Sequence, residues 1–158
     1  MPEFILQIKA ELENIKLLKP LDCVNWKFDI ESSSGETRQN ITFSPVDEIE
    51  LEGSRGISNF IIKWPGEREQ AHIKIVPIKK SDGSYKDSDS EKFVSILGLE
   101  CRGVIPTRWI PGEDFSAISS GGHIFEEVDM TDLSWADYDE KNDMSVSIMN
   151  LEHKIIRA

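Results

Sequence analysis

Two stretches of the chain place a nucleophile near a candidate partner residue, as covalent catalysis requires. Cys101 and Arg108 are separated by six residues, one more than in a cysteine phosphatase loop. Ser119 precedes His123, but nothing around it resembles the strand–turn–helix motif that exposes a catalytic serine. Neither stretch therefore predicts a nucleophilic enzyme.

Two other stretches contain groups that could bind an ion. Asp137-x-Asp139-x-Lys141 starts like a calcium-binding loop, but Lys141 occupies a ligand position and Asn142 stands where that loop needs glycine. The backbone amides of Gly53-Ser54-Arg55-Gly56 could cradle an anion. A tight turn with a structural Arg55 is the simpler interpretation.

An acid/base enzyme remains an alternative. Its catalytic groups would come from Glu100, His123 and the Asp137–Glu140 cluster. It requires a pocket that joins His123 to a carboxylate with a perturbed pKa. Because no catalytic constellation stands out, we expect a protein that is not an enzyme.

The negative charge is concentrated in one segment. The net charge is −11, and residues 112–143 hold ten carboxylates against Lys141 alone. Nucleic-acid binding needs clustered Lys and Arg to neutralise phosphates, so we do not expect it. Such an acidic surface often serves only solubility. If it binds a protein partner, that partner is basic.

The composition suits a cytoplasmic protein. The only cysteines, Cys23 and Cys101, lie far apart in sequence, which fits unpaired thiols in a reducing compartment. The start of the chain, with Glu3 in it, does not look like a signal peptide. The apolar runs are too short to cross a membrane, so no membrane association is expected.

Alternating apolar residues predict strands at 4–14 and 93–103. Ile8, Ala10 and Leu12 share one face of the first strand, and Leu97, Leu99 and Cys101 share one face of the second. Phe4 aligns with Phe93 and Glu11 with Glu100 when the two strands are superimposed, which suggests an internal duplication. We therefore expect two similar β halves at 1–80 and 91–158, joined by a polar linker at 81–90.

Other segments also favour strands. Val24, Trp26, Phe28 and Ile30 alternate, and the runs 59–64 and 71–77 flank Pro65-Gly66, the central pair of a type II turn. No stretch has a helical period. The predicted fold is all-β and resembles a β-sandwich.

These residues give the chain a resemblance to a known family, the CXXC motif containing zinc binding proteins. It is strongest at Leu6-x-x-Lys9-Ala10-x-Leu12-Glu13-Asn14-Ile15, at Gly53-Ser54-Arg55-Gly56, at Glu100-Cys101-Arg102-Gly103, and at Trp135-x-Asp137-Tyr138-Asp139-Glu140-Lys141 with Ser145-Val146. The resemblance implies an intracellular all-β protein of two similar halves with no established enzymatic activity.

The chain departs from this family at the motif that names it. The resemblance places the four zinc ligands at Glu31, Ser34, Trp64 and Glu67, where no cysteine stands. A structural zinc needs four Cys or His ligands, so we expect no zinc and no other cofactor. We expect the Trp64 ring to fill the space between the two turns and to replace the metal.

The favoured interpretation is a non-catalytic protein-interaction or scaffold module that has lost its zinc site. An alternative is a metal or small ligand bound elsewhere, for instance between Glu31 and Glu67. Pairing of these glutamates with Lys63 or Arg68 explains them more simply.

Overall fold

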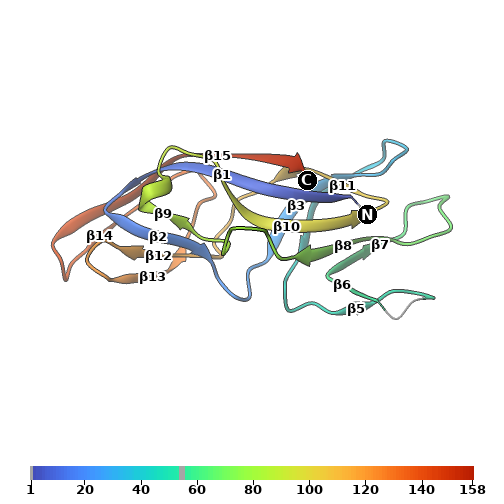
Figure 1. Ribbon diagram of the computed structural model, residues 1–158, viewed down its shortest axis with the longest axis horizontal. Helices are drawn as coiled ribbons and strands as arrows, with labels where there is room; N and C mark the ends of the chain where they lie inside the picture. The colour runs from blue at the N-terminus through green and yellow to red at the C-terminus, as the bar shows by residue number, and fades with distance from the viewer. Residues whose placement is uncertain (1, 54–55) are drawn as a thin grey trace.

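The computed structural model describes residues 2–53 and 56–158 and is built almost entirely of β-strands. Figure 1 shows an elongated molecule in which β1, β10 and β15 run along the long axis. These strands belong to a six-stranded sheet with the order β14 (Trp135–Asp139), β15 (Met144–Arg157), β1 (Glu3–Glu13), β10 (Val94–Arg102), β8 (Ala71–Val76) and β7 (Phe60–Ile62).

Strands β1 and β10 form the centre of this sheet. They pair antiparallel, with Phe4 opposite Leu99 and Leu6 opposite Leu97. The predicted inward residues of both strands are buried, including Ile8 at 0% and Cys101 at 1% exposure, except for Leu12, which is partly buried. The period-two pattern therefore identified both strands and their buried faces.

Three smaller sheets complete the fold. One has the order β11 (Ile105–Trp109), β3 (Trp26–Glu31) and β4 (Thr37–Phe43). Another has the order β13 (Ile124–Val128), β12 (Phe115–Ser119), β2 (Ile15–Pro20) and β9 (Tyr85–Lys86). The last pairs β5 (Ile49–Glu50) with β6 (Ile57–Ser58).

The strand order is symmetric about the β1–β10 pair. The β7–β8 hairpin extends the large sheet beyond β10, and the β14–β15 hairpin extends it beyond β1. The β3–β4 hairpin takes β11 from the other half of the chain, and the β12–β13 hairpin takes β2 in return. Internal duplication stays a prediction, and this correspondence supports it.

One core joins the sheets, as in a sandwich. Trp26, Trp109 and Phe115 meet from three strands, with ring centroids 6.0 to 6.4 Å apart, and all three are buried. The Trp109 ring also packs edge-on against His153 of β15, 5.7 Å away. Aromatic contacts therefore tie the small sheets to the large one.

The segment 81–90 differs from the expected linker. It contains β9 and a 3-10 turn, Asp87–Asp89, and Tyr85 is completely buried. The Tyr85 hydroxyl lies 2.6 Å from the carbonyl oxygen of Asp89 and 2.7 Å from that of Lys92. A single aromatic residue in a polar stretch has no periodicity, so its burial was not predictable from the sequence.

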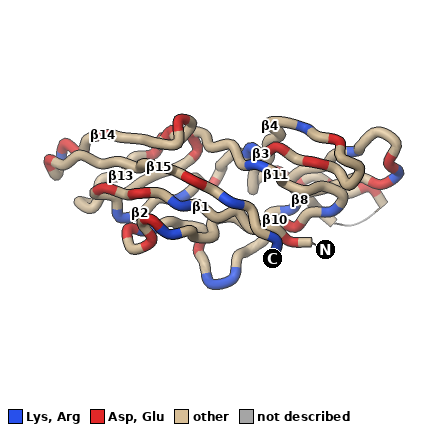
Figure 2. Tube along the Cα trace, turned by 90° about the horizontal axis from the view of Figure 1, so that it is seen from above, with Lys and Arg blue, Asp and Glu red and all other residues tan. Residues whose placement is uncertain are grey.

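Strands β12, β13 and β14, which carry much of the acidic segment 112–143, lie at one end of the molecule (Figure 1). Figure 2 shows Asp and Glu along the loops that join β13, β14 and β15. The structure also contains, in the range it describes, no helix with the length and apolar character needed to span a membrane.

Candidate functional site

The first turn predicted at the family's metal site follows Glu31, the last residue of β3. The Ser32 amide donates to the Glu36 carbonyl at 2.7 Å, and the Ser32 hydroxyl accepts from the Glu36 amide at 3.0 Å. The hydroxyls of Ser32 and Ser34 lie 3.0 Å apart. Serine hydroxyls and backbone groups therefore close this turn without a metal.

The second turn runs from Trp64 to Glu67. The Glu67 amide donates to the Trp64 carbonyl at 3.1 Å, and Gly66 has φ +83°, as a type II turn requires. The flanking hairpin is confirmed, because Phe60 of β7 pairs with Ile73 of β8.

Trp64 is buried at the start of the second turn. Its side chain is 2% exposed, and its Nε1 donates to the Gly103 carbonyl at 3.0 Å. The Arg38 guanidinium of β4 lies 5.5 Å from the ring centroid. Ser33 of the first turn and Glu67 of the second line the same hollow of about 200 Å³ as Trp64. The ring thus joins the second turn to the residue that follows β10, and it borders a hollow that the first turn also lines.

The stretch Glu100–Gly103 supports this ring. Cys101 is buried, and burial raises the pKa of its thiol to about 12, so it is an inert core residue. Arg102 pairs with Glu69 at 3.4 Å on the surface, and Glu100 lies opposite Lys74 of β8. Gly103 has φ +71°, and a side chain there would approach Ala71 to 3.1 Å. Glycine at this position can therefore adopt the backbone conformation that orients the Gly103 carbonyl toward Trp64 Nε1.

Gly53 and Gly56 lie in the segment between β5 and β6. Gly53 has φ +69°, and the Leu51 amide donates to the Gly56 carbonyl at 3.0 Å. Arg55, singled out in the sequence, lies outside the described residues, as does Ser54. The anion-cradle hypothesis depends on these two residues.

No sequence pattern singles out His72. It lies opposite Arg102 on β8 and is 6% exposed, and within the described residues its Nδ1 has no hydrogen-bond partner. Burial, followed by the Arg102 charge, lowers its pKa, so the ring is neutral. It lines a hollow of about 360 Å³ together with Gly53 and Arg102.

The acidic stretch around Asp139 has a structural network at its centre. Asp139 is covered by neighbouring side chains although it lies close to the surface. Its carboxylate accepts from the Ser119 hydroxyl at 2.6 Å and from the Asn142 side chain at 2.8 Å. The Ser119 hydrogen bond is the main cause of its lowered pKa. The carboxylate thus joins β12 to the β14–β15 turn.

This network contains no nucleophile–base pair. The His123 backbone amide, not its ring, bonds the Ser119 hydroxyl at 3.0 Å, and the His123 ring packs edge-on against Phe125. The acid/base alternative needs the ring of His123 beside a carboxylate with a perturbed pKa. The His123 charge is the smallest of the causes that lower the pKa of Asp139, after the hydrogen bonds from Ser119 and Asn142.

The remaining residues of this stretch lie on or near the surface. Trp135 is half-buried against Phe125, at 5.2 Å between ring centroids. The Tyr138 hydroxyl donates to Asp143, and Asp137 accepts from the Tyr138 amide at 2.7 Å. Glu140 and Lys141 are exposed on the turn.

Comparison with known proteins covers almost the whole chain. The sequence profile of the eukaryotic CXXC motif containing zinc binding proteins matches residues 5–156. The chain belongs to this family. It is 30% identical to the rat CXXC motif containing zinc binding protein over the full length of both, and 32% identical to that of Xenopus laevis, again over both full lengths. A solved structure described as a hypothetical protein from Plasmodium falciparum superimposes with a TM-score of 0.93 at 35% identity, covering 99% of this chain and 100% of the other.

The residues present do not fit the zinc for which the CXXC family is named. Cys23 and Cys101 are free and do not form a Cys-x-x-Cys motif. Ser34, Trp64 and the two glutamates cannot form the tetrahedral Cys or His site that structural zinc prefers. Among the described residues, no group of three or more His, Cys, Asp or Glu could hold a metal.

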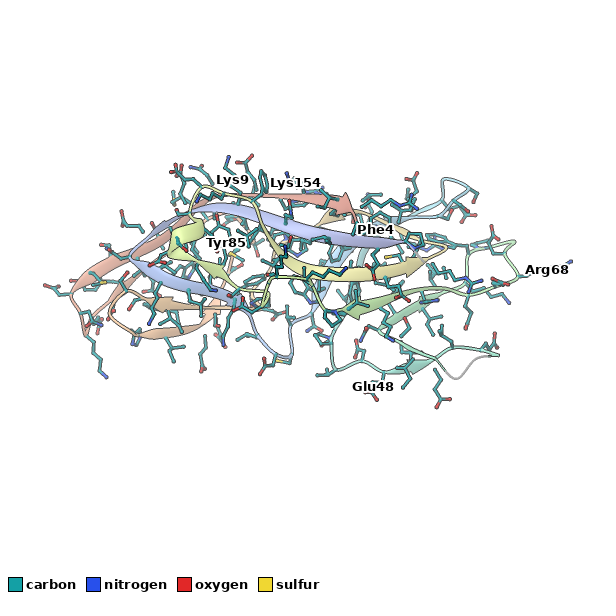
Figure 3. The ribbon with its side chains drawn as sticks, viewed as in Figure 1. Phe4, Lys9, Glu48, Arg68, Tyr85 and Lys154 are labelled. Carbon is teal, nitrogen blue, oxygen red and sulfur yellow. The ribbon has the colours of Figure 1, made fainter. Side chains whose placement is uncertain are left out.

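The expected ion pairs of Glu31 and Glu67 are not found. The salt bridges within 2–53 and 56–158 include neither glutamate. Figure 3 shows Arg68 extending away from the protein at the tip of the β7–β8 loop. Exposure to water, which solvates a carboxylate well, makes a partner unnecessary for Glu67.

Proposed function

We propose that this member of the CXXC family is a non-catalytic protein-interaction module whose two turns are held together by Trp64 instead of zinc. The observation that carries the proposal is the packing of Trp64, which is buried at one of the four ligand positions and bonded to Gly103. Zinc normally contributes folding energy by cross-linking two such turns. In this chain, burial of a large aromatic ring supplies that cross-link.

The state of the reactive side chains supports a role without catalysis. The Cys101 thiol is buried with a raised pKa, and Asp139 is bonded to Ser119 and Asn142. The His153 Nε2 accepts a hydrogen bond from the Trp109 amide. These groups stabilise the fold, which leaves binding as the role that the surface can perform. Both cysteines are free, in keeping with a reducing, cytoplasmic location.

Elemental analysis of the purified protein tests the metal part of the proposal. We expect much less than one zinc per chain, and an unfolding temperature that a chelator does not change. About one zinc per chain would contradict the proposal and would direct attention to the three histidines and two cysteines.

Affinity capture from native lysate under reducing conditions tests the interaction part. The tagged chain should retain a protein partner that a tag-only control does not. Turnover by the purified protein of a substrate would contradict the non-catalytic role.

Small-ligand binding is a second candidate, favoured by the His72 Nδ1, which lies beside this hollow and has no hydrogen-bond partner within residues 2–53 and 56–158. Buried polar atoms without partners are rare and often mark an absent ligand or water. A compound that raises the unfolding temperature of the wild type but not of His72→Leu would support it. A screen in which both proteins respond alike would contradict it.

A further inference from the structure

A groove of about 630 Å³ lies along β1 and β15, lined also by residues of the acidic segment 112–143. We propose that it binds a segment of a partner protein in which Lys or Arg residues flank an apolar side chain. The proposal rests on the interaction function proposed above and names the surface and the chemistry of the partner.

A β-bulge builds the floor of this groove. The pairing of β1 with β15 shifts register between Lys9 and Glu11, and Asn150 opposite adopts φ +54°. The Asn150 side-chain amide donates to the Glu11 carboxylate at 2.8 Å, which holds the bulge. Bulges bend and twist a strand pair, so the sheet is not flat at this point.

Two loops are tied to this floor by backbone hydrogen bonds and form the walls. The Leu151 amide donates to the Leu133 carbonyl at 3.0 Å, and the Glu91 amide donates to the Ala10 carbonyl at 2.8 Å. Leu133 and Glu91 have φ +63° and +68°. Side-chain-bearing residues rarely adopt such backbone angles, and where they do the site is often functional.

Two large apolar side chains are exposed in the groove. Leu133 is 47% exposed and Met149 is 44% exposed, although both line the same hollow. A partner's apolar side chain would cover both, and the flexible Met149 thioether can adapt to its shape. This pair supplies the apolar part of the recognition.

Carboxylates surround these apolar side chains. Glu11, Glu91, Asp132 and Glu152 line the groove, and Lys9 is the one basic side chain among its described lining residues. Lys9 is already engaged, with its Nζ 3.8 Å from Glu152 and 5.6 Å from the Phe93 ring centroid. Figure 3 shows Lys9 beside Lys154 on the outer side of the sheet. The excess of negative charge selects a cationic segment and repels an acidic one.

Fluorescence anisotropy with labelled peptides tests the groove. The first peptide has lysines on both sides of a central pair of leucines, the second replaces the leucines by serines, and the third replaces the lysines by glutamates. We expect the full-length protein to bind the first more tightly than the second by about fivefold or more, because the apolar anchor is lost. The third should not bind. Raising the salt concentration from about 50 to about 300 mM should weaken the first complex.

Single substitutions locate the binding surface. Met149→Ser removes an exposed apolar side chain of the groove, and Asp132→Lys reverses a charge. Each should weaken the binding of the lysine–leucine peptide by about fivefold or more. The matched controls are Val46→Ser and Glu127→Lys, exposed residues that do not line the groove, and they should change the affinity by less than about twofold. Thermal unfolding verifies that all four variants are folded.

Three results would overturn the proposal: no binding of the lysine–leucine peptide, equal binding of the serine peptide, or equal effects of the groove and control variants. Failure of the interaction function is seen separately, as the absence of any captured partner. A partner captured equally by wild type and Met149→Ser would refute the groove and leave the interaction function intact.

Discussion

Replacing Trp64 by alanine tests whether this ring supplies the stability that zinc gives to other proteins. The ring is 2% exposed, and burying a tryptophan of about 150–250 Å² at about 25 cal/mol per Å² gives at most about 4–6 kcal/mol. The substitution also removes the hydrogen bond to Gly103 and the cation–π contact with Arg38. We expect the free energy of unfolding to fall by about 3–5 kcal/mol. That is a large share of the roughly 5–15 kcal/mol typical of a whole domain.

Urea unfolding of wild type and Trp64→Ala measures this change. Trp64→Phe is the matched comparison, because it keeps an aromatic ring but loses the N–H donor, and it should cost about 1–2 kcal/mol. Trp135→Ala, at a half-buried tryptophan away from the turns, should cost less than Trp64→Ala. A loss below about 1 kcal/mol for Trp64→Ala, with an unchanged m-value, would refute the replacement of zinc by Trp64.

Three further predictions concern titratable groups. The hydrogen bond from Ser119 is the main cause of the lowered pKa of Asp139, so the Asp139 carboxylate contributes stability above its unfolded pKa of about 4 and loses that contribution at lower pH. Ser119→Ala should therefore make the loss of stability at acid pH less steep. An unchanged loss would contradict this. Burial lowers the pKa of His153, so the free energy of unfolding should fall as the pH drops below about 6.5. His153→Gln should reduce the slope of this free energy against pH between about pH 7 and 5.5, and an equal slope would contradict this. In the native protein, a thiol reagent at about pH 8 should modify the exposed Cys23 and leave the buried Cys101, whose pKa is about 12, unmodified. Both thiols should react in urea. Rapid labelling of two thiols in the native protein would show that Cys101 is accessible.

The sequence by itself determined the strands and their buried faces. Alternation is a property of neighbouring residues, so Ile8 and Leu99 could be assigned to the core without knowledge of their partners. The type II turn at Pro65-Gly66 was also predictable, because the φ angles of proline and glycine are set locally. The place of Trp64 at the second turn followed from this turn and from the resemblance of the chain to its family, and its role in joining the two turns stays a prediction.

Only the tertiary structure decided which strands pair and what the loops cover. The pairing of β2 with β12 and of β3 with β11 joins segments far apart in sequence, and no local pattern specifies such partners. The burial of Tyr85 and His72 depends on segments that fold over them. The groove at Leu133 and Met149 likewise exists because the bulge and a distant loop meet there. These features arise from long-range packing, which periodicity along the chain does not encode.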